Sequence, residues 1–568
     1  MTDKIEYDVL LVGAGPANLT LAHRLVDLAD KPIRIAILDK ARDVGGHLLS
    51  GAASNPRVLK KLFPDWDKGE IPIQGICTES YLSVIGERRW ENVPSMLVPS
   101  YFKKEGYAIL NISDLAAGMI AKITEKAEAK DGVVVDVYPG FPAQEIVYDA
   151  DRVAGVKVDN TDSDFADICY ANVTVFGDKG FISRDLISRF NLRKNPQVYS
   201  VGVKEVWETA KSYEGKIWHT LGYPLSPGHL GGGFIYGCKD NKLIIGMVMG
   251  LDSPNPNIRP PQVLQDLKKH PYVQEMIRGG SLVKYGAAIL PEGGLYSMPE
   301  KFAVDGAMIV GDALGTMDVK RFSGVDKAME SGYVAGEVIW GAFNKNDFSA
   351  SSLSDYQKKL MGGWVGAELN DARYFRKAFS DYPDILNTFI PRMTKQIDSG
   401  KSVVFAGLQG GLADPFGSLR LLGARKMIEN PSGNQPAVYK EDRTHINARY
   451  KESKREPESF DPATIYSTAD VVFYAHTHYE EENKHIEEFD AKVCARCIKE
   501  YDDAGKDTPC VGDCTAEVHQ TLGQNGDRRH AMALENCVQC TTCEIVCPYE
   551  NLRVRAALHG YGPDFSGM

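Results

Sequence analysis

The sequence lacks several features that would place it in a common class of protein. No uninterrupted apolar run reaches about eighteen residues, so a membrane-spanning helix is not expected. No secretory signal opens the chain, since Met1–Tyr7 is polar and charged and the following apolar run has only strand length. Basic residues are not in excess: the chain has 65 basic and 76 acidic residues, for a net charge of −11. This balance disfavours a nucleic-acid partner.

Cysteine is scarce in most of the chain and crowded at its end. Only Cys77, Cys169 and Cys238 precede Cys494, and the other eight of the 11 cysteines fall between Cys494 and Cys547. Without a secretory signal, stable disulfides are not expected, and clustered cysteines indicate metal ligands. We expect the three early cysteines to be buried packing residues.

The overall composition is that of a globular protein. It is 43% apolar, 25% charged and 9% aromatic, which excludes a disordered or collagen-like chain. At about 150 residues per domain, 568 residues correspond to three or four domains.

The N-terminal segment has the pattern of a βαβ unit. An apolar strand from Tyr7 runs into a glycine turn, a helix is expected over Leu19–Asp30, and a second strand over Ile33–Asp39. The turn fits G-x-G-x-x-G except for Asn18 at the last position. Its glycines allow a tight turn and a close approach to a pyrophosphate, and the strand's final acid can bind a ribose. Alone, the pattern leaves a chance glycine turn as the alternative.

Later segments strengthen the case for a dinucleotide. A strand and turn recur at Val173–Gly180 and again at Ala307–Asp312, followed by a helical pattern from Gly324 to about Trp340. FAD enzymes of the glutathione-reductase and hydroxylase type carry such a late strand ending in Gly-Asp, and the next helix points at the flavin. No second G-x-G-x-x-G occurs between the two parts. The sequence therefore predicts a discontinuous FAD-binding domain without a separate NAD(P)H domain.

The rest of the chain before the cysteines divides into three kinds of segment. Gly232–Tyr236 and Lys242–Met249 have strand character and suit an antiparallel sheet. Residues from about 353 to 430 look mainly helical, and residues 431–485 read as a polar linker.

The cysteine-rich tail contains a specific iron–sulfur pattern. Cys537, Cys540, Cys543 and Cys547-Pro548 form C-x2-C-x2-C-x3-C-P, the spacing of bacterial ferredoxins. Structural zinc sites use pairs of C-x2-C, so zinc is the weaker alternative. In two-cluster ferredoxins the fourth cysteine of this run binds the other cluster. The predicted 4Fe-4S ligands are thus Cys514, Cys537, Cys540 and Cys543 for the first cluster and Cys494, Cys497, Cys510 and Cys547 for a second.

With these residues in view, the chain resembles the electron-transfer-flavoprotein:quinone oxidoreductases and their bacterial relatives of the nitrogen-fixation type. The resemblance rests on motifs spread over nearly the whole chain: Gly46–Ala52, Leu62–Trp66, Val137–Gly140, Gly202–Trp207, His219–Pro224, Gly250–Asp252, Tyr285–Ala287, Glu292–Gly294, Trp364–Val365 with Glu368–Leu369 and Arg373, and Gly567–Met568. The family's single cluster would use the first set of cysteines. The additional cysteines look like a fusion to a two-cluster ferredoxin-like module.

The resemblance implies the function. Reduced electron-transfer flavoprotein, which could be a bifurcating one, would donate electrons through the clusters to FAD, and a membrane quinone would accept them. The protein would lie peripherally on the cytoplasmic side of the inner or plasma membrane and would not be secreted. The alternatives are a ferredoxin-coupled flavin reductase of isoprenoid double bonds, such as a geranylgeranyl reductase, and an electron-carrier subunit of a bifurcating complex.

The predicted architecture is α/β, with a Rossmann-like FAD-binding domain over 1–70, 105–190 and 295–350. A quinone-binding sheet domain is predicted over 71–104 and 191–294. A helical membrane-associating region over 351–430, a linker over 431–485 and a ferredoxin-like α+β iron–sulfur domain over 486–568 follow. Two segments are candidates for membrane contact, Ser402–Leu422 and Val93–Phe102 with the lysines after it; a buried core helix and a surface loop are the respective alternatives.

Two sets of cofactor contacts complete the expectations. The FAD contacts are predicted as Gly13, Gly15, Pro16, Ala17, Asp39, Lys40, Gly46, His47, Gly311, Asp312, Gly324 and Val325. The quinone contacts are predicted as Gly232, Gly233, Tyr236, Gly407, Gly410 and Gly411. No general acid or base is assigned.

Overall fold

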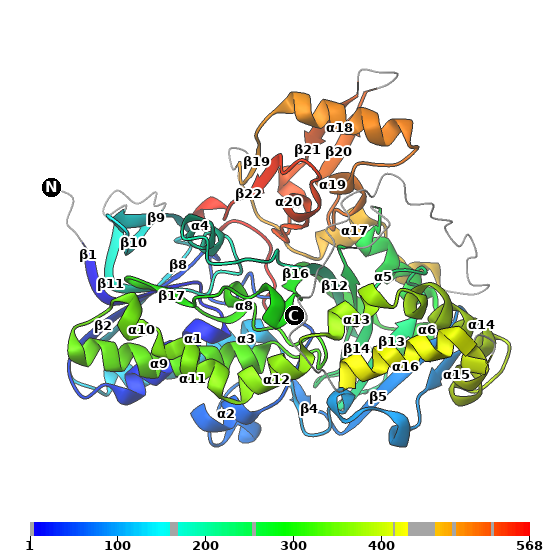
Figure 1. Ribbon diagram of the computed structural model, residues 1–568, viewed down its shortest axis with the longest axis horizontal. Coiled ribbons are helices and arrows are strands. Elements are labelled where there is room, and N and C mark those ends of the chain that lie inside the picture. The colour runs from blue at the N-terminus through cyan, green and yellow to red at the C-terminus, as the bar shows by residue number, and fades with distance from the viewer. Residues whose placement is uncertain are drawn as a thin grey trace.

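Three regions make up the chain, and the cysteine-rich one lies over the boundary between the other two (Figure 1). The computed structural model describes residues 5–158, 168–252, 257–412, 415–429, 461–479, 484–523 and 528–568. The first region surrounds an eight-stranded sheet, the second a seven-stranded sheet, and the third is built from short helices and two two-stranded sheets.

The first region is a mainly parallel sheet covered by helices. Its path is β17-β18-β11-β1-β2-β8, and β10 and β9 attach beside β11. The strands are β1 (Ile5–Val12), β2 (Ile33–Asp39), β8 (Val133–Pro139), β9 (Ala143–Asp149), β10 (Arg152–Val158), β11 (Ile168–Phe176), β17 (Ala303–Val304) and β18 (Ala307–Ile309). The helices are α1 (Pro16–Leu28), α2 (Arg57–Leu62), α3 (Ile112–Glu128), α4 (Ser183–Arg189), α8 (Gly311–Leu314) and α9 (Val325–Lys345).

The predicted βαβ unit is confirmed. β1 pairs in parallel with β2 on one side and with β11 on the other, and β11 in turn pairs in parallel with β18. Val9, Leu10 and Leu11 are fully buried because helices cover both faces of the sheet. α1 begins three residues before the predicted helix, at Pro16, since a proline suits the first helical position. These pairings bring the three glycine turns to one edge of the sheet.

The second region is a seven-stranded sheet in the order β16-β12-β15-β14-β13-β5-β6. All neighbours are antiparallel except β13 and β5. The strands are β5 (Glu79–Ile85), β6 (Trp90–Asn92), β12 (Tyr199–Glu208), β13 (Lys216–Gly222), β14 (Gly231–Gly237), β15 (Lys242–Gly250) and β16 (Ser281–Pro291). The predicted antiparallel strands 232–236 and 242–249 are confirmed as β14 and β15, which pair with each other.

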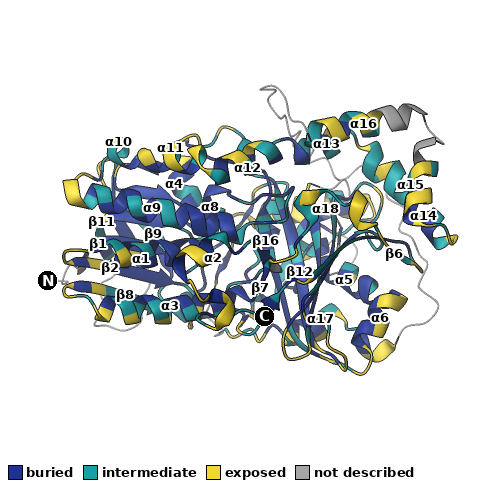
Figure 2. Cartoon of the chain, turned by 90° about the horizontal axis from the view of Figure 1, so that it is seen from below, coloured by how far each residue is buried: buried dark blue, intermediate teal, exposed yellow. Residues whose placement is uncertain are grey.

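Helices cover one face of this sheet, and a small sheet connects it to the first region. α5 (Pro260–Lys269) packs against β12 and β15, and α6 (Pro271–Ile277) packs against α5. The small sheet consists of β3 (Ala52–Ser54), β7 (Ala108–Leu110) and β4 (Gly75–Ile76). Figure 2 shows the buried residues concentrated in the two large sheets and in the helix faces turned toward them.

The helical segment after residue 350 is also confirmed. Its helices are α10 (Ala350–Leu353), α11 (Asp355–Gly362), α12 (Trp364–Ala372), α13 (Phe375–Asp381), α14 (Ile390–Asp398), α15 (Val403–Leu412) and α16 (Pro415–Glu429), besides the short α7 (Gly294–Ser297). A separate apolar cluster joins α14 and α15 to β5 through Val84, Met393 and Val403. Within the described residues, no helix is both long and apolar enough to cross a membrane.

The third region holds the eight terminal cysteines. It consists of β19 (Ile486–Glu488), α18 (Ala491–Asp503), α19 (Pro509–Gly512), β20 (His519–Leu522), β21 (Arg529–Met532), α20 (Thr542–Val546) and β22 (Leu552–Val554). β19 pairs with β22 and β20 with β21, both antiparallel. Most of the predicted linker, residues 430–460, lies outside the described residues. Its later part packs on the second region, where α17 (Thr468–Phe473) buries Val471 and Val472 against β16.

Candidate functional site

The glycine turn after β1 forms a cradle at the N-terminus of α1. Gly13 has a φ of 91°, and a side chain there would place a Cβ atom 2.9 Å from the carbonyl oxygen of Gly177. The turn therefore needs glycine for both conformation and space. Gly15 precedes the first turn of α1, so the free N–H groups of that helix face the cradle. This is the geometry that binds a pyrophosphate.

Asn18, which departs from the glycine motif, has a structural explanation. Its side-chain amide donates hydrogen bonds to the carbonyl oxygens of Val12 and Gly13, at 2.9 and 2.8 Å. The side chain fills the space against Gly177, where a Cβ atom would lie 2.8 Å from the Asn18 amide nitrogen. Hydrogen bonds thus hold the turn to the helix where the usual third glycine would allow close packing.

Asp39 ends β2 and is buried below the cradle. Its carboxylate accepts hydrogen bonds from the backbone N–H groups of Ala14 and Ala41, each at 2.8 Å. Burial raises the pKa of this carboxyl, and the two backbone donors counteract the rise. Each oxygen keeps a further lone pair, so the carboxylate can still accept from a ribose hydroxyl.

The late Gly-Asp pair meets the early cradle. Gly311 has a φ of 60°, and its backbone N–H donates to Ser331 Oγ at 2.9 Å. A Cβ atom at Gly311 would lie 3.0 Å from that of Ala17 on α1. Asp312 follows on the cavity wall, where burial raises its pKa and Lys179 lowers it. Gly324 is the residue before α9 and Val325 its first residue, as predicted.

These residues line one large cavity of about 1600 Å³. Its wall includes seven of the predicted FAD contacts, Gly15, Pro16, Ala17, Gly311, Asp312, Gly324 and Val325. Gly13, Asp39, Lys40 and His47 line a smaller adjoining cavity of about 100 Å³. Gly46 lines neither; its carbonyl accepts from the backbone N–H of Phe565 at 2.7 Å. The glycine cradle, the buried acids and the size of the cavity fit a bound FAD.

The terminal thiols fall into two groups. Burial, Cys547 and Cys494 raise the pKa of the Cys497 thiol to about 12. Burial also raises the pKa of the Cys510 thiol, together with Cys497, Cys547 and Cys494. In the other group, Cys540 and Cys514 raise the pKa of the Cys537 thiol beyond the effect of burial. Cys540, Cys537 and Cys514 do the same for the Cys543 thiol. This is the partition that the sequence predicts for two clusters. Cys510 also acts on Cys543, so the two groups are adjacent.

Backbone and side-chain N–H groups point at the sulfur atoms. Cys514 accepts from the N–H of Val518 at 3.3 Å, and Cys537 accepts from that of Gln539 at 3.3 Å. In the other group, Asn551 donates from its backbone to Cys547 and from its side chain to Cys494, both at 3.2 Å. Such donors stabilise thiolates and influence the potential of an iron–sulfur cluster. Both groups of cysteines therefore fit 4Fe-4S clusters.

Three further residues beside the second group were not predicted. His519 Nδ1 lies 2.9 Å from His530 Nε2, and His530 Nδ1 lies 2.6 Å from a Glu488 oxygen. Ligand atoms of His519 and His530 lie within 4.8 Å of the Cys510 sulfur, and His530 and Glu488 come as near to Cys494. The β20–β21 hairpin brings the two histidines together, and no spacing in the sequence indicates this.

The cysteine region is fixed to the FAD-binding region by polar contacts. Arg553 makes a two-pronged ion pair with Asp185 of α4, at 2.6 and 2.7 Å, and Arg184 pairs with Glu544 of α20. Lys40 donates to Gln539, inside the C-x2-C segment, at 2.5 Å. Cys540 and Gln539 line the small cavity together with Asp39. The first group of cysteines therefore borders the nucleotide site.

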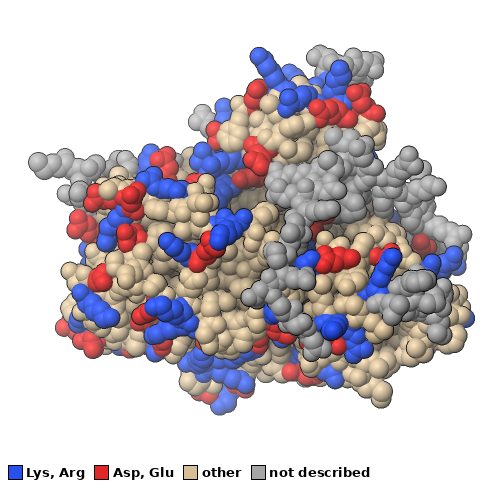
Figure 3. All heavy atoms as spheres, viewed as in Figure 1, with Lys and Arg blue, Asp and Glu red and all other residues tan. Residues whose placement is uncertain are grey.

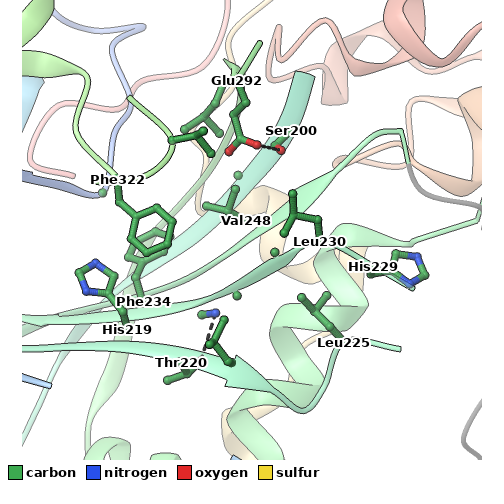
Figure 4. A pocket seen from close by; sticks show the side chains of 18 of the residues that line it. Ser200, His219, Thr220, Leu225, His229, Leu230, Phe234, Val248, Glu292 and Phe322 are labelled. Atoms are coloured by element: carbon green, nitrogen blue, oxygen red, sulfur yellow. Dashed lines mark hydrogen bonds between the residues drawn. The ribbon is translucent and has the colours of Figure 1, made fainter. Parts of the chain in front are cut away.

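The other end of the large cavity lies on the second sheet. Gly232, Gly233 and Tyr236 of β14 line it, and Gly233 N donates to Thr220 Oγ1 at 3.1 Å. His219 Nε2 lies 2.9 Å from the Tyr236 hydroxyl, and His219 packs beside Phe322 (Figure 4). Burial and Lys104 lower the pKa of His219 to about 3, so its ring is neutral at pH 7. The three glycines predicted on the helical segment belong to α15: Gly407 is absent from the described lining, and the surroundings of Gly410 and Gly411 are outside the description.

One acidic side chain on this cavity wall was missed as a site residue. Ser200 Oγ donates to Glu292 at 2.6 Å, and the two side chains face each other in Figure 4. Arg376, which is buried, lies 3.1 Å from the same Glu292 oxygen and 2.7 Å from Asp252. Burial raises the pKa of Glu292, opposed mainly by Arg376. Glu292 belongs to a motif of the resemblance, but only the fold places it on the cavity.

The cavity ends under the helical segment in an apolar lining that includes Leu386, Phe389 and Met393. Outside this lining, apolar side chains reach the surface: Met96 is 89% exposed and Leu408 is 63% exposed. α15 is thus apolar on both sides, with Val403 and Ala406 buried and Leu408 outside. The lysines after Val93–Phe102 do not both belong to a surface, because Lys104 is buried and donates to the carbonyl of Arg321 at 2.5 Å. Figure 3 shows charges of both signs interspersed over one face.

Two family models match the chain. "ETF-QO, ubiquinone-binding" matches residues 199–290, which cover the second sheet from β12 to β16. "Electron transfer flavoprotein-ubiquinone oxidoreductase, 4Fe-4S" matches residues 459–566, and thus begins before the predicted boundary at 486.

Curated relatives match over the full length. An electron transfer flavoprotein-ubiquinone oxidoreductase of Pseudomonas aeruginosa is 28% identical, over 99% of this chain and 99% of its own. The mitochondrial enzyme of Arabidopsis thaliana is 30% identical over 100% and 85%, and that of Bos taurus is 30% identical over 99% and 89%.

Solved structures share the fold at low identity. A geranylgeranyl bacteriochlorophyll reductase-like protein of Thermoplasma acidophilum has a TM-score of 0.55 at 16% identity, over 74% of this chain and 100% of its own. A halogenase in complex with FAD has a TM-score of 0.50 at 15% identity, over 74% and 85%. Both likenesses show that the fold of this chain is shared with these proteins.

Proposed function

The chain belongs to the electron transfer flavoprotein-ubiquinone oxidoreductase family, and from this membership and the site we infer how it works. It is an oxidoreductase that takes electrons from reduced electron transfer flavoprotein and passes them to a quinone. Bound FAD would store two electrons, and bound clusters would carry electrons one at a time. The overall balance is two electrons and two protons added to one quinone to give one quinol.

FAD would occupy the large cavity from the glycine cradle to the second sheet. Gly13, Gly15 and the N-terminus of α1 would hold the pyrophosphate, and Asp39 the adenosine ribose. Asp312 and the start of α9 would lie near the flavin end. The observation that carries this proposal is that one small cavity is lined both by Asp39 of this nucleotide site and by Cys540.

Two clusters would be bound, each by one group of cysteines. Cys514, Cys537, Cys540 and Cys543 would hold the cluster next to FAD, and Cys494, Cys497, Cys510 and Cys547 the outer one. Proximity of Cys510 to Cys543 supports a relay between them. Cys494 on α18 is only half-buried, so the outer cluster would lie near the surface and would receive electrons from the donor. A relay that reaches the surface suits a protein donor, and the donor that we propose is a bifurcating electron transfer flavoprotein.

The quinone would enter from the apolar end of the cavity. Its headgroup would lie near Gly232, Gly233 and Tyr236, with Gly407, Gly410 and Gly411 retained as lower-ranking candidates. Met96, Leu97, Phe405 and Leu408 are exposed apolar side chains, and Val403 of the same helix as Phe405 and Leu408 packs against Met393 of the cavity lining. They support peripheral contact with a membrane, for which we propose the cytoplasmic face.

Iron, acid-labile sulfide and FAD should be measured on anaerobically purified protein. About eight irons per FAD are expected for two clusters and about four for one. In the Cys510→Ser variant the signal of the outer cluster should disappear, while Cys540→Ser should remove that of the inner one. Zinc without sulfide would contradict both assignments.

Activity is tested with reduced electron transfer flavoprotein and a short-chain quinone. Reduction of the quinone, with no saturation of a geranylgeranyl substrate in a parallel assay, is the expected result. Rapid reduction of the clusters without quinol formation would instead indicate an electron-carrier subunit.

A further inference from the structure

Two lysines stand between the nucleotide site and the inner group of cysteines. Lys40 follows Asp39 at the end of β2, and Lys179 lies in the loop after β11. Both side chains line the small cavity, together with Cys540. Lys179 also lines the large cavity with Gly15 and Asp312. The two cations therefore lie where the FAD-binding and cluster-binding parts of the site meet.

Lys40 has no acidic partner within hydrogen-bonding distance in the described part of the chain. Its ammonium group donates to the Gln539 carbonyl oxygen at 2.5 Å and lies over the Phe181 ring, 4.5 Å from its centre. The Asp39 carboxylate next to it is occupied by two backbone N–H groups. Gln539 also binds Cys537 Sγ through its backbone N–H, at 3.3 Å. The Lys40 side chain thus contacts the residue next to Cys540, a proposed ligand of the inner cluster.

The charge of the Lys179 ammonium group has fewer favourable partners than that of Lys40. Across the described ranges its ammonium group makes no hydrogen bond and no ion pair. Asp312 attracts it from a distance, and Lys40 repels it. Its backbone φ of 57° is uncommon for a side chain other than glycine, asparagine or aspartate. A lysine held in this conformation, facing two cavities without a counter-ion, indicates that an anionic group belongs beside it.

We propose that Lys40 and Lys179 compensate the negative charge that collects between FAD and the inner cluster, Lys179 on the FAD side and Lys40 on the cluster side. This rests on the proposed function, since it requires both cofactors. The pyrophosphate and a cluster with four thiolate ligands are anionic, and each transferred electron adds a further negative charge. In a buried site a fixed cation stabilises that charge more strongly than water-exposed lysines can. Both reduction potentials would therefore depend on these lysines.

The behaviour of the two ammonium groups supports this placement. Burial lowers the pKa of Lys40 to about 7; Asp39 and Cys537 oppose this shift, and the nearby Lys179 adds to it. Burial likewise lowers the pKa of Lys179, against Asp312. Bound anions on either side would stabilise the charged form of both side chains.

The test uses the anaerobically purified holoprotein with the variants Lys40→Gln, Lys179→Gln and the charge-retaining Lys179→Arg. The matched control is Lys157→Gln, since Lys157 is the exposed residue of the otherwise covered β10. Glutamine can still bind Gln539 but carries no charge. Redox titration follows the flavin by absorbance and each cluster by its paramagnetic signal. We expect Lys40→Gln to decrease the equilibrium constant for reduction of the inner cluster at least tenfold, which lowers its reduction potential by ~59 mV for one electron. Lys179→Gln should decrease the equilibrium constant for reduction of FAD at least tenfold, which lowers the flavin potential by ~30 mV for two electrons.

The outer cluster serves as the internal reference and should not move in any variant. Lys179→Arg should keep the native flavin potential and FAD content. If Lys179→Gln is purified with less FAD, recovery in Lys179→Arg supports the proposal, and equal loss in both refutes it as a packing defect. Native potentials in both glutamine variants would also refute it. Absence of FAD or iron from the unmodified protein would instead refute the proposed function.

Discussion

Replacing Lys268 with methionine tests how the second sheet is held to the helix that forms the cavity wall. Lys268 on α5 lies 2.9 Å from a Glu205 oxygen on β12, and both side chains are fully buried. Glu205 also accepts from Gln265 at 2.8 Å and from the Trp207 indole at 2.7 Å. Methionine preserves the length of the lysine stem over Trp207 but removes the charge. It leaves Glu205 as a buried carboxylate without a cation.

The expected cost is about 3–5 kcal/mol, because breaking a buried pair leaves one charge uncompensated in a low-dielectric interior. Urea unfolding followed by tryptophan fluorescence measures it as a shift of the midpoint at constant slope. The matched control is Lys211→Met. Lys211 pairs with Glu275 at the same 2.9 Å distance, but both side chains are largely exposed, so no measurable change is expected.

The double variant Lys268→Met with Glu205→Gln separates charge from packing. Removing both charges should recover at least half of the lost stability, since neutral replacements of a buried pair are often tolerated. Two results would refute the reasoning: a loss below about 1 kcal/mol in the single variant, or a double variant no more stable than the single one. The second result would assign the cost to packing around Trp207.

Three further predictions concern pH, the cofactor cradle and the membrane. Burial lowers the pKa of Lys204 to about 8, so above that pH the folded chain binds fewer protons than the unfolded chain. The free energy of unfolding should therefore rise toward pH 10, by up to ~1.4 kcal/mol per pH unit from this group. Lys204→Met should remove that pH dependence, as measured by unfolding curves. Gly13→Ala should cost more than half of the bound FAD, measured by flavin absorbance after gel filtration, since its Cβ atom would lie 2.9 Å from the Gly177 oxygen; full FAD content would contradict the cradle. Leu408→Glu should weaken flotation with phospholipid vesicles several-fold, and equal binding beside the unmodified protein would remove α15 from the membrane surface.

Local patterns in the sequence were sufficient to predict the main helices and strands and the kinds of cofactor. The βαβ unit, the late Gly-Asp pair and the start of α9 follow from apolar runs ending in glycine, because strand and helix periods and turn conformations are properties of neighbouring residues. The ferredoxin spacing from Cys537 to Cys547 is equally local, and it predicts an iron–sulfur site before any fold is known.

The tertiary structure decided what surrounds those elements. Lys40 meets Gln539, which lies 499 residues away in the chain, and Glu292 reaches the cavity beside Ser200 through the pairing of β12 with β16. The pairing of His519 with His530 depends on the register of β20 and β21. No short pattern encodes such contacts, because they depend on strand order and on how separate regions pack. For the same reason Asn18 reads as a defect of the glycine motif in the sequence and as its hydrogen-bonded replacement in the fold.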